Sequence, residues 1–468
     1  MEKDLLIIGG GPGGYVAAIR GAQLGMDVAL VEADRIGGTC LNRGCIPTKA
    51  LYANAQLMDK LAHADSFGIK VDGYQMDMGQ VMDRKDSVVD QLVKGTDKVV
   101  EDNGVLILRG FATFLSSEAV EVELHDGTTE VVKAKSVIIA TGSVPSSPPV
   151  PGNDLPGVID SDQLLEMREL PKRMVVAGSG VIGMEFASIY NSFGSEVTVI
   201  SSTLLKRIDK DIVKRLPLIL KKRGLKLHDG ARAKEIRKTD TGLLMIATNK
   251  KGETIEVEAD VVLMAVGRRA FVDGLNLEAA GVIFDGTGIP VDNRFQTNVP
   301  NIYAIGDVLG GVMLAHVASH HGIACVEGIA TGEAPHHGST VPDCIFIDPQ
   351  IAYAGLTEEQ AVAKGYEVKT GKFNFVANGK ALSMGETDGF VKVVADAATL
   401  KILGVHIMGP HASDLIHEAS LAIDHQMDVH AIGNSIHAHP TLAEALHEAV
   451  LNVTDTAIHI SPTKPRKK

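Results

Sequence analysis

Residues 4–14 read DLLIIGGGPGG, a short apolar run that leads directly into a cluster of glycines. The glycines of this G-x-G-x-x-G pattern are Gly9, Gly11 and Gly14. The apolar spacing of residues 15–25 predicts a helix, and a second strand is predicted at residues 27–32, ending at Glu32. In such a strand–turn–helix–strand unit, the glycines let backbone N–H groups approach a pyrophosphate at the helix N-terminus. The stretch therefore predicts a dinucleotide site.

The same order of elements recurs later in the chain, within residues 173–201. The glycines of this repeat are Gly178, Gly180 and Gly183. In the first unit 32 − 14 = 18 residues separate the last glycine from the end of the second strand, and in the repeat 201 − 183 = 18 residues do so. For either turn alone, a glycine-rich turn without a ligand is the alternative. The matched repeat favours two dinucleotide sites in an α/β fold.

The residue that ends the second strand differs between the two units. In the first unit it is Glu32, and a carboxylate at this position accepts hydrogen bonds from a ribose 2′-OH. The alternative is an acid at the strand end that is exposed to water. In the repeat it is Ser201, which can bond a hydroxyl but does not repel a 2′-phosphate. Lys206 and Arg207 follow nearby. The second site is therefore open to NADP as well as to NAD.

The composition argues against several classes of partner. The 468 residues include 45 Lys and Arg and 58 Asp and Glu, a formal net charge of −13, which disfavours a nucleic-acid or anionic-lipid surface. With 7 Tyr, 12 Phe and no Trp, a stacking platform for single strands is also disfavoured. No apolar run approaches the ~18 residues of a membrane helix. The first residues lack the features of a secretory signal, so a cytoplasmic location is predicted.

The rest of the sequence predicts further domains. A Pro-rich stretch at residues 143–157 is typical of a connector. Beyond residue 340, alternating strands precede a His-rich helical tail, as in an α+β domain. The predicted limits are 1–145 for the first part of the first dinucleotide-binding domain, 146–270 for the second such domain, 271–340 for the return to the first, and 341–468 for a C-terminal domain.

Two of the four cysteines, Cys40 and Cys45, share the segment GGTCLNRGCIPTKAL at residues 37–51. In a regular helix their separation corresponds to a rise of ~7.5 Å, whereas a disulfide needs Cα atoms ~4.4–6.8 Å apart. If they pair, the segment must be irregular, and Gly44 and Pro47 suit that need. Because no further zinc ligands stand nearby, a redox pair is favoured over a metal site or inert thiols.

Taken together, these features resemble the flavoprotein pyridine nucleotide-disulfide reductases, and most of all their lipoamide branch. Besides the glycine turns and the cysteine segment, the similar motifs are ATG at 140–142, GVIGME at 180–185, AVGRR at 265–269, AIGD at 304–307 and HAHPTLAEAL at 437–446. The resemblance implies two Rossmann-like dinucleotide-binding domains, for FAD and NAD, and a C-terminal α+β dimerisation domain. Two residues depart from the family pattern: Arg43 replaces a small apolar residue, and Ser201 replaces an acid.

The resemblance also implies which residues bind the cofactors, and it implies no metal ligands. The cofactor-binding residues are Gly9, Gly11, Gly14, Glu32, Lys49, Ala140, Thr141, Gly142, Gly178, Gly180, Gly183, Glu185, Ser201, Gly267 and Asp307. Asp307 is expected to accept a hydrogen bond from the ribityl chain of the flavin. Lys49 is expected to lie near the flavin ring, where a cation favours the reduced form, and to pair with Glu185.

Near the C-terminus, His439 and Glu444 admit two interpretations. Thr441 stands three residues before Glu444, which is the spacing of a capping box, and His439 is then only a turn residue. Alternatively, the Glu444 side chain leans back toward His439 and orients it as a general base for a thiol. The resemblance favours catalysis. It also implies that His439 reaches the cysteines of the other subunit, so a homodimer is expected.

The activity implied by the resemblance is the oxidation of dihydrolipoyl groups through a Cys40–Cys45 disulfide and FAD, with reduction of NAD. Cys40 is expected to exchange with the substrate thiol, and Cys45 to lie on the flavin side. The lipoyl carrier is expected to belong to a 2-oxo-acid dehydrogenase, an acetoin dehydrogenase or a glycine cleavage system. Two alternatives stay open. One is an NADPH-dependent disulfide reductase of the same family, and the other is a non-catalytic flavoprotein acting as scaffold or redox sensor.

Overall fold

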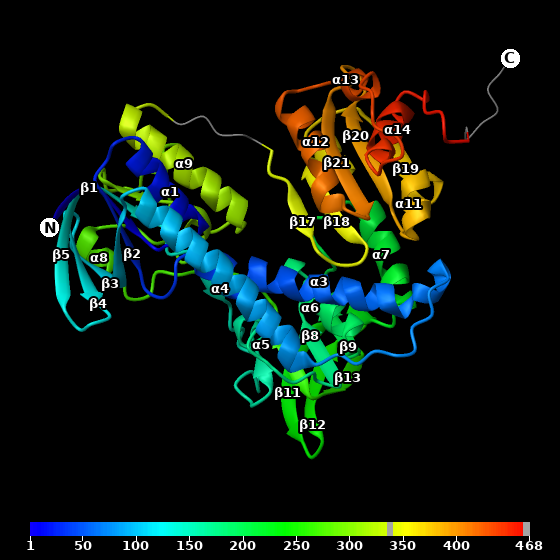
Figure 1. Cartoon of the computed structure of the whole chain (residues 1–468), viewed down its shortest axis with the longest axis horizontal. Helices are drawn as coiled ribbons and strands as arrows, with labels where there is room; N and C mark the ends of the chain where they lie inside the picture. Colours follow the sequence, from blue (N-terminus) through cyan, green and yellow to red (C-terminus); the bar gives the residue numbers. More distant parts are fainter. Residues whose placement is uncertain (335–339, 462–468) are drawn as a thin grey trace. The chain divides into compact units, whose positions relative to one another are not determined.

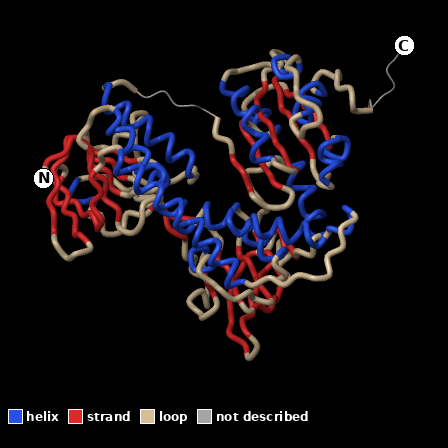
Figure 2. Tube along the Cα trace, viewed as in Figure 1, coloured by secondary structure: helices blue, strands red, loops and turns tan. Residues whose placement is uncertain are grey.

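The computed structural model describes residues 1–334 and 340–461 (Figure 1 and Figure 2). Its internal contacts divide the chain into two compact units, each built from several segments. The first unit joins residues 1–149, 159–170 and 265–337, and the second joins 150–158, 171–264 and 338–468. The four domain limits given above remain predictions, and residues 335–339 and 462–468, which fall within two of them, lie outside the described residues.

The first unit is built on parallel strands in the order β16-β5-β1-β2-β3. They are β1 (Glu2–Ile8), β2 (Val28–Glu32), β3 (Leu106–Ser116), β5 (Thr129–Ile139) and β16 (Ile302–Ala304). Strands β3 and β5 extend beyond this sheet and pair with β4 (Ala119–Leu124) as an antiparallel meander. Residues 5–8 of β1 are buried, as expected of a central parallel strand that is covered on both faces.

Two helices of the first unit pack closely because glycine lies between them. α1 (Pro12–Gln23) and α9 (Ala315–Thr331) run side by side (Figure 1). A Cβ on Gly322 of α9 would lie 2.5 Å from the carbonyl oxygen of Gly13 in α1, so a larger residue would force the helices apart. α1 begins before the start predicted at residue 15, because the end of the glycine turn already has helical backbone.

The cysteine segment forms two helices separated by a break. The helices of this region are α2 (Gly38–Arg43), α3 (Cys45–Ala62) and α4 (Met78–Asp102). The break is at Gly44, whose φ of −148° and ψ of −110° are not helical, so the irregularity expected of this segment is present. Leu41 of α2 packs against Val89 and Val93 of α4, which anchors the segment on a long helix.

The first half of the second unit repeats the plan of the first unit, which confirms the internal repeat predicted from the glycines. Its main elements are β8 (Arg173–Ala177), α6 (Val181–Ser192), β9 (Glu196–Ser201), α7 (Lys210–Lys222), β10 (Lys226–Asp229) and β14 (Val261–Met264). The parallel strands lie in the order β10-β9-β8-β14. Between β10 and β14 the chain forms the antiparallel meander β11 (Arg232–Thr239), β12 (Gly242–Thr248) and β13 (Thr254–Ala259).

The second half of this unit is an α+β structure with one antiparallel sheet, in the order β17-β18-β21-β20-β19. The strands are β17 (Asp343–Ile345), β18 (Gln350–Gly355), β19 (Val368–Asn374), β20 (Phe390–Asp396) and β21 (Ile402–Gly409). Helices α12 (Ala412–Asp424) and α14 (Glu444–Asn452) pack on the sheet around a buried apolar core. Together with the two parallel sheets, this confirms the predicted fold class.

Shorter elements complete the chain. They are η1 (Ala64–Phe67), β6 (Ser143–Pro145), β7 (Val158–Ile159), α5 (Ser161–Leu164), β15 (Arg268–Ala270), α8 (Leu277–Ala280), η2 (Gly306–Leu309), α10 (Glu358–Ala363), η3 (Phe375–Ala377), α11 (Gly379–Met384) and α13 (Val429–Gly433). In the part of the chain that the structure describes, no helix combines the length and the apolar character that crossing a membrane requires.

A buried ion cluster joins the two halves of the second unit. The Lys392 side chain, on β20, is 2% exposed, and its Nζ donates to both carboxylate oxygens of the fully buried Asp209 at 3.0 Å. Glu358 accepts from the same Nζ at 2.9 Å, and Asp211 lies 3.3 Å from it. Asp209 also caps α7 by accepting from the Asp211 N–H at 2.9 Å. Lys392 and Asp209 are both withdrawn from water. Removing either side chain would therefore leave the other as a buried charge without its main partner.

Lys392→Met is expected to lower the free energy of unfolding by about 3–5 kcal/mol, since it leaves Asp209 buried without its main cationic partner. Urea-induced unfolding followed by circular dichroism measures this loss. Lys210→Met is the matched control, because Lys210 pairs with Glu359 at 2.6 Å near the surface, where water screens the pair. Equal losses in the two variants would contradict the stabilising role of the buried cluster.

Candidate active site

The first glycine turn lies at the carboxyl edge of the parallel strands, where ligands bind in α/β sheets. Gly9 follows β1 with a φ of +104° and donates its N–H to the carbonyl of Val31 at 2.8 Å. A Cβ on Gly14 would lie 1.7 Å from the Gly9 oxygen, so the turn closes only with glycine at that position. At Gly11 a Cβ would meet only the Cα of Gly38, at 3.9 Å. The open backbone at this helix N-terminus fits a pyrophosphate.

If the first glycine turn holds the FAD that the resemblance implies, Gly14→Ala should abolish flavin retention, because the added methyl group would overlap the Gly9 carbonyl and open the turn. The purified variant should lack the visible absorbance of bound flavin, and added FAD should not restore it. Gly95→Ala in α4 is the control: nothing lies within 4 Å of the added methyl group. Alanine there is expected to stabilise the helix by about 0.5–1 kcal/mol. Full flavin occupancy in Gly14→Ala would contradict the role of the turn.

Two further turns meet the glycine turn at this edge. A Cβ on Gly9 would lie 2.5 Å from the carbonyl oxygen of Ala140, so the turn that Thr141 and Gly142 continue touches the glycine turn. Asp307 follows β16, and its Oδ2 accepts from the Ser143 hydroxyl at 2.6 Å. Burial raises the pKa of Asp307, and the bond from Ser143 acts in the opposite direction. The structure thus brings predicted residues that follow β1, β5 and β16 to one edge of the sheet.

Glu32 ends β2 at the same edge and holds the glycine turn in place. It is 7% exposed, and its Oε2 accepts from the Gly10 N–H at 2.7 Å while its Oε1 accepts from the Asp34 N–H at 2.7 Å. Burial raises the pKa of Glu32, and the hydrogen bond from Gly10 opposes that shift. Both oxygens are engaged by the backbone. The expected bond to a ribose 2′-OH has to use their remaining lone pairs and stays a prediction.

The cysteine segment is docked on the glycine turn by two more glycines. The Gly37 N–H donates to the carbonyl of Gly10 at 2.8 Å, and a Cβ on Gly38 would lie 2.7 Å from the Cα of Gly11. Gly37 and Gly38 have φ values of +99° and +52°, in the left-handed region that glycine adopts readily. Because this backbone contact allows no side chain, it sets α2, with Cys40, beside the first glycine turn.

Cys40 and Cys45 lie in contact across the break at Gly44. Their thiols are hydrogen-bonded, and this bond is the main reason that the pKa of Cys40 is raised, with burial as the second reason. The positive charge of Lys49, one turn further along α3, acts in the opposite direction and favours a thiolate. Two adjacent sulfurs beside a cation form an arrangement suited to reversible dithiol–disulfide exchange.

The second glycine turn has the same backbone geometry as the first. Gly178 has a φ of +112° and donates its N–H to the carbonyl of Ile200 at 2.9 Å. Gly180 precedes α6 with φ −71° and ψ −176°, and Gly11 precedes α1 with φ −68° and ψ −176°. Gly183 is buried in the first turn of α6. The two predicted turns are therefore the same structural motif.

The other residues predicted for the second site are distributed over both units. Ser201 ends β9, is buried, and has its hydroxyl bonded to that of Ser179 in the glycine turn. Glu185 of α6 is buried, and its Oε1 accepts from the Phe346 N–H, which belongs to the same unit, at 3.0 Å. Gly267 follows β14 with a φ of +139°, in a segment that belongs to the first unit. The pairing of Glu185 with Lys49 joins residues of different units and stays a prediction.

His439 and Glu444 are in contact at the start of α14. The Nδ1 of His439 lies 2.8 Å from Glu444 Oε1, and the imidazole is 77% exposed. Glu444 Oε2 accepts from the Thr441 N–H at 2.8 Å. Burial acts to raise the pKa of Glu444, but the bonds from Thr441 and His439 outweigh it and lower the pKa. An ionised Glu444 at neutral pH keeps the proton on Nδ1 and leaves Nε2 as the accepting nitrogen.

The contacts of this pair bear on both interpretations, and the role of His439 in catalysis stays a prediction. The bond from the Thr441 N–H to Glu444 resembles one half of a capping box, but α14 begins at Glu444 with Ala443 as its N-cap, so Thr441 does not cap this helix. The other half is missing, because the Thr441 hydroxyl donates to the carbonyl of Ala438 at 2.8 Å instead of capping the helix. Glu444 therefore binds the backbone with one oxygen and orients His439 with the other.

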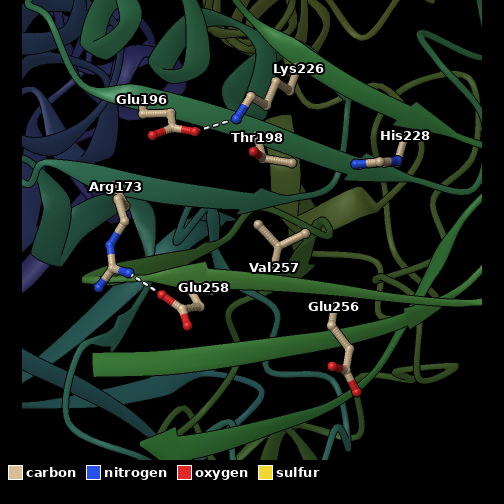
Figure 3. A pocket seen from close by; sticks show the side chains of 8 residues that line it. All are labelled: Arg173, Glu196, Thr198, Lys226, His228, Glu256, Val257 and Glu258. Atoms are coloured by element: carbon tan, nitrogen blue, oxygen red, sulfur yellow. Dashed lines mark hydrogen bonds and ion pairs between the residues drawn. The ribbon is translucent and has the colours of Figure 1, made fainter. Parts of the chain in front are cut away.

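A pocket of about 350 Å³ in the second unit is lined by residues outside the predicted set (Figure 3). They are Arg173, Glu196, Thr198, Lys226, His228, Glu256, Val257 and Glu258. Arg173 pairs with Glu258 at 2.5 Å, and Lys226 pairs with Glu196, as Figure 3 shows. Because these cations are neutralised by acids of the pocket itself, it offers little attraction to a phosphate. Within residues 1–334 and 340–461, no three His, Cys, Asp or Glu side chains are grouped so as to hold a metal ion.

Three residues that sequence reasoning did not assign to a site support residues that it did. Arg268 Nε donates to the Ser143 hydroxyl at 2.8 Å, and Ser143 in turn donates to Asp307. Ser179 bonds Ser201. Arg268, Ser143 and Ser179 each stand within or directly beside a motif quoted above. This proximity in the sequence is the signal by which they could have been found. The bonds themselves span long stretches of chain and leave no local pattern.

Two protein-family models match the chain. The model described as pyridine nucleotide-disulphide oxidoreductase matches residues 3–322. The model described as the dimerisation domain of pyridine nucleotide-disulphide oxidoreductases matches residues 341–450. The two matches cover both glycine turns, the cysteine segment and the pair His439–Glu444.

Full-length relatives agree with these matches. The chain is 43% identical to the dihydrolipoyl dehydrogenase of Bacillus subtilis (strain 168), over 98% of this chain and 99% of the relative. It is 41% identical to the mitochondrial dihydrolipoyl dehydrogenase of Pisum sativum, over 98% and 93%. Among solved structures, LpdA from Mycobacterium tuberculosis matches with a TM-score of 0.87 at 28% identity, over 96% of this chain and 99% of that one. The HOCl-induced flavoprotein disulfide reductase RclA from Escherichia coli matches with a TM-score of 0.85 at 28% identity, over 96% and 99%.

Proposed function

Since this chain belongs to the pyridine nucleotide-disulphide oxidoreductase family, we propose that it is a dihydrolipoyl dehydrogenase. It oxidises protein-bound dihydrolipoamide to lipoamide and passes the electrons to a nicotinamide dinucleotide, for which the family resemblance implies NAD. The observation that carries the proposal is the hydrogen-bonded pair of Cys40 and Cys45 beside the first glycine turn. A dithiol substrate requires such a pair, because its two electrons leave as one disulfide bond forms.

The proposed exchange starts from the oxidised Cys40–Cys45 pair. A dihydrolipoyl thiolate attacks Cys40 Sγ, a new S–S bond forms, the Cys40–Cys45 bond breaks, and Cys45 leaves as a thiolate. The second dihydrolipoyl thiolate attacks the lipoyl sulfur of the mixed disulfide, closes the lipoamide ring and releases Cys40 as a thiolate. The substrate has then lost two protons and two electrons, and the cysteine pair holds the electrons.

His439 is the proposed base for the proton transfers. Its Nε2 accepts the proton of the attacking thiol, while Glu444, bonded to Nδ1 at 2.8 Å, stabilises the charge that the imidazole gains. The imidazole is well exposed in one chain, which suits a base that acts on the cysteine pair of the partner subunit. The match of residues 341–450 to a dimerisation domain supports this homodimer.

The first unit fits FAD as the carrier between the cysteine pair and the dinucleotide. Its glycine turn leaves Gly11 open, and the same edge gathers Glu32 and Asp307. The group that these residues would hold, FAD, would supply two-electron transfer between the dithiol and the nicotinamide. Lys49 places a cation beside Cys40 and favours the Cys40 thiolate that the second exchange step releases.

The proposed partners follow from the substrate. The lipoyl group is carried by a separate protein of a 2-oxo-acid dehydrogenase, acetoin dehydrogenase or glycine cleavage complex. The net charge of −13 is consistent with a protein partner in place of a nucleic acid or an anionic membrane. The cytoplasmic location stays a prediction.

A steady-state comparison of two substrate pairs tests the proposal. The purified holoenzyme is assayed with dihydrolipoamide and NAD, and separately with oxidised glutathione and NADPH. We expect turnover with the first pair and ping-pong kinetics, because the cysteine pair is reduced before the dinucleotide reacts. Turnover only with the second pair would overturn the proposal in favour of an NADPH-dependent disulfide reductase.

A further inference from the structure

In the second unit, a pair of hydroxyls stands where the first unit has a carboxylate. In the first unit, the Gly10 N–H donates to Glu32 at the end of β2. In the second, Ser179 stands in the middle of the glycine turn, and its hydroxyl bonds that of Ser201 at the end of β9. Ser179 is 3% exposed and Ser201 is 4% exposed. At the position where the first site carries an acid, the second site therefore has two uncharged hydroxyl groups.

The hydrogen bonds of this pair leave Ser201 no proton for a ligand. The Ser179 hydroxyl donates to the carbonyl of Thr203 at 3.1 Å, so the proton between the two hydroxyls comes from Ser201. Ser201 Oγ in turn accepts from the Thr203 N–H at 3.1 Å. A hydroxyl has one proton to donate, and here it is used within the protein. Ser201 acts on the ligand by lacking charge, not by bonding its 2′ position.

The chain after β9 folds back onto the glycine turn and then presents two cations. The Leu205 N–H donates to the carbonyl of Ser179 at 3.3 Å, which brings this loop against the turn. Lys206 and Arg207 follow directly and are exposed. No ion pair among the described residues holds either of them. Both cations follow the strand end that reads the 2′ position of a bound dinucleotide. The charge of Arg207 also acts on Tyr353 of β18, where it opposes the rise of the tyrosine pKa, so Lys206 is the cation with no other charged neighbour among the described contacts.

An acid also lies beside this strand end, and its contacts limit its influence. Asp229 ends β10 in register with Ser201. Its Oδ1 accepts from the Leu204 N–H at 2.9 Å, so this carboxylate is turned toward the backbone of the loop. Two further acids lie close to the cations, and both are engaged within the protein: Asp209 pairs with Lys392, and Asp343 accepts from the Tyr353 hydroxyl.

We propose that the second dinucleotide site accepts a 2′-phosphate, so that it binds NADP at least as tightly as NAD. Lys206 and Arg207 bind the phosphate, and Ser201 determines the specificity because a carboxylate in its place would repel it. The inference deepens the proposed function and rests on it only in taking the second glycine turn as the dinucleotide site.

Calorimetric titration of the purified holoenzyme with two small ligands tests this inference without turnover. The ligands are adenosine 2′,5′-bisphosphate and adenosine 5′-monophosphate, which differ only in the 2′-phosphate. We expect the bisphosphate to bind about tenfold more tightly, the gain of one charge-assisted hydrogen bond, with the preference weakening as ionic strength rises. Equal or weaker binding of the bisphosphate would overturn the inference.

Variants test which residues cause the preference for the bisphosphate. Lys206→Met and Arg207→Met should each weaken binding of the bisphosphate several-fold and leave the monophosphate unchanged, whereas Lys221→Met, at the end of α7, should change neither. The double variant S179G/S201E rebuilds the Gly10–Glu32 pair of the first site, and it should reverse the preference so that the monophosphate binds more tightly. If neither cation variant changes the affinity for the bisphosphate, the inference is wrong even where the double variant fails to fold.

The inference and the proposed function fail in different ways. Turnover of dihydrolipoamide with NAD, combined with no preference for the bisphosphate, overturns only the 2′-phosphate inference. Tight binding of the bisphosphate, combined with no turnover of dihydrolipoamide with NAD or NADP, overturns only the proposed function.

Discussion

Replacing Cys45 with serine is expected to reduce dihydrolipoamide-dependent reduction of the dinucleotide by more than about a thousandfold, as the loss of a nucleophile in a covalent mechanism typically does. Serine cannot form the disulfide with Cys40, so the substrate dithiol has no bond to exchange with. A hydroxyl is also a poor leaving group compared with a thiolate. Turnover is measured by absorbance of the reduced dinucleotide at saturating dihydrolipoamide.

Flavin content separates loss of chemistry from loss of fold. Cys45→Ser is expected to keep its flavin, because the first glycine turn is built by Gly9, Gly11 and Gly14 and not by the cysteines. Cys344→Ser in β17 is the matched control and should keep both flavin and turnover, since it belongs to the C-terminal sheet of the other unit. Unchanged turnover in Cys45→Ser would contradict the proposed function and favour a non-catalytic flavoprotein.

His439→Gln is expected to lower turnover by about 10²–10⁴-fold, the usual contribution of a positioned general base. Glutamine keeps a hydrogen-bonding side chain near Glu444 but accepts no proton from the attacking thiol. The loss should appear in the reaction with dihydrolipoamide. Oxidation of the reduced dinucleotide by an artificial electron acceptor, which requires no thiol proton transfer, should change little.

Glu444→Gln tests the orienting contact at the base. The pKa of Glu444 is held below its usual value, so the ionised contact with His439 is present at neutral pH and is lost only as the pH falls through that lowered pKa. The variant should lose less turnover than His439→Gln, because the imidazole remains. His430→Gln, on the exposed surface of α13, is the control. If His430→Gln costs as much turnover as His439→Gln, the assignment of the base is wrong.

The local sequence was sufficient wherever function depends on backbone conformation. Gly9 and Gly178 have positive φ and Gly14 admits no Cβ, and these demands produce a pattern that is readable within six residues. The break at Gly44 was predictable from the reach of a disulfide compared with the rise of a helix. The contact of His439 with Glu444 was within range of sequence reasoning, because first-turn side chains lean toward the helix N-terminus.

Only the tertiary structure decided which of these segments meet and which side chains support them. Ser143 donates to Asp307 across 164 residues, and Lys392 reaches Asp209 across 183. The docking of Gly38 on Gly11, which sets the cysteines beside the glycine turn, was likewise absent from any local pattern. The physical reason is that such contacts follow from strand order and helix packing, which bring distant segments to one edge of a sheet. Helix and strand periodicity and glycine conformation act within one or two turns of chain and carry no record of that arrangement.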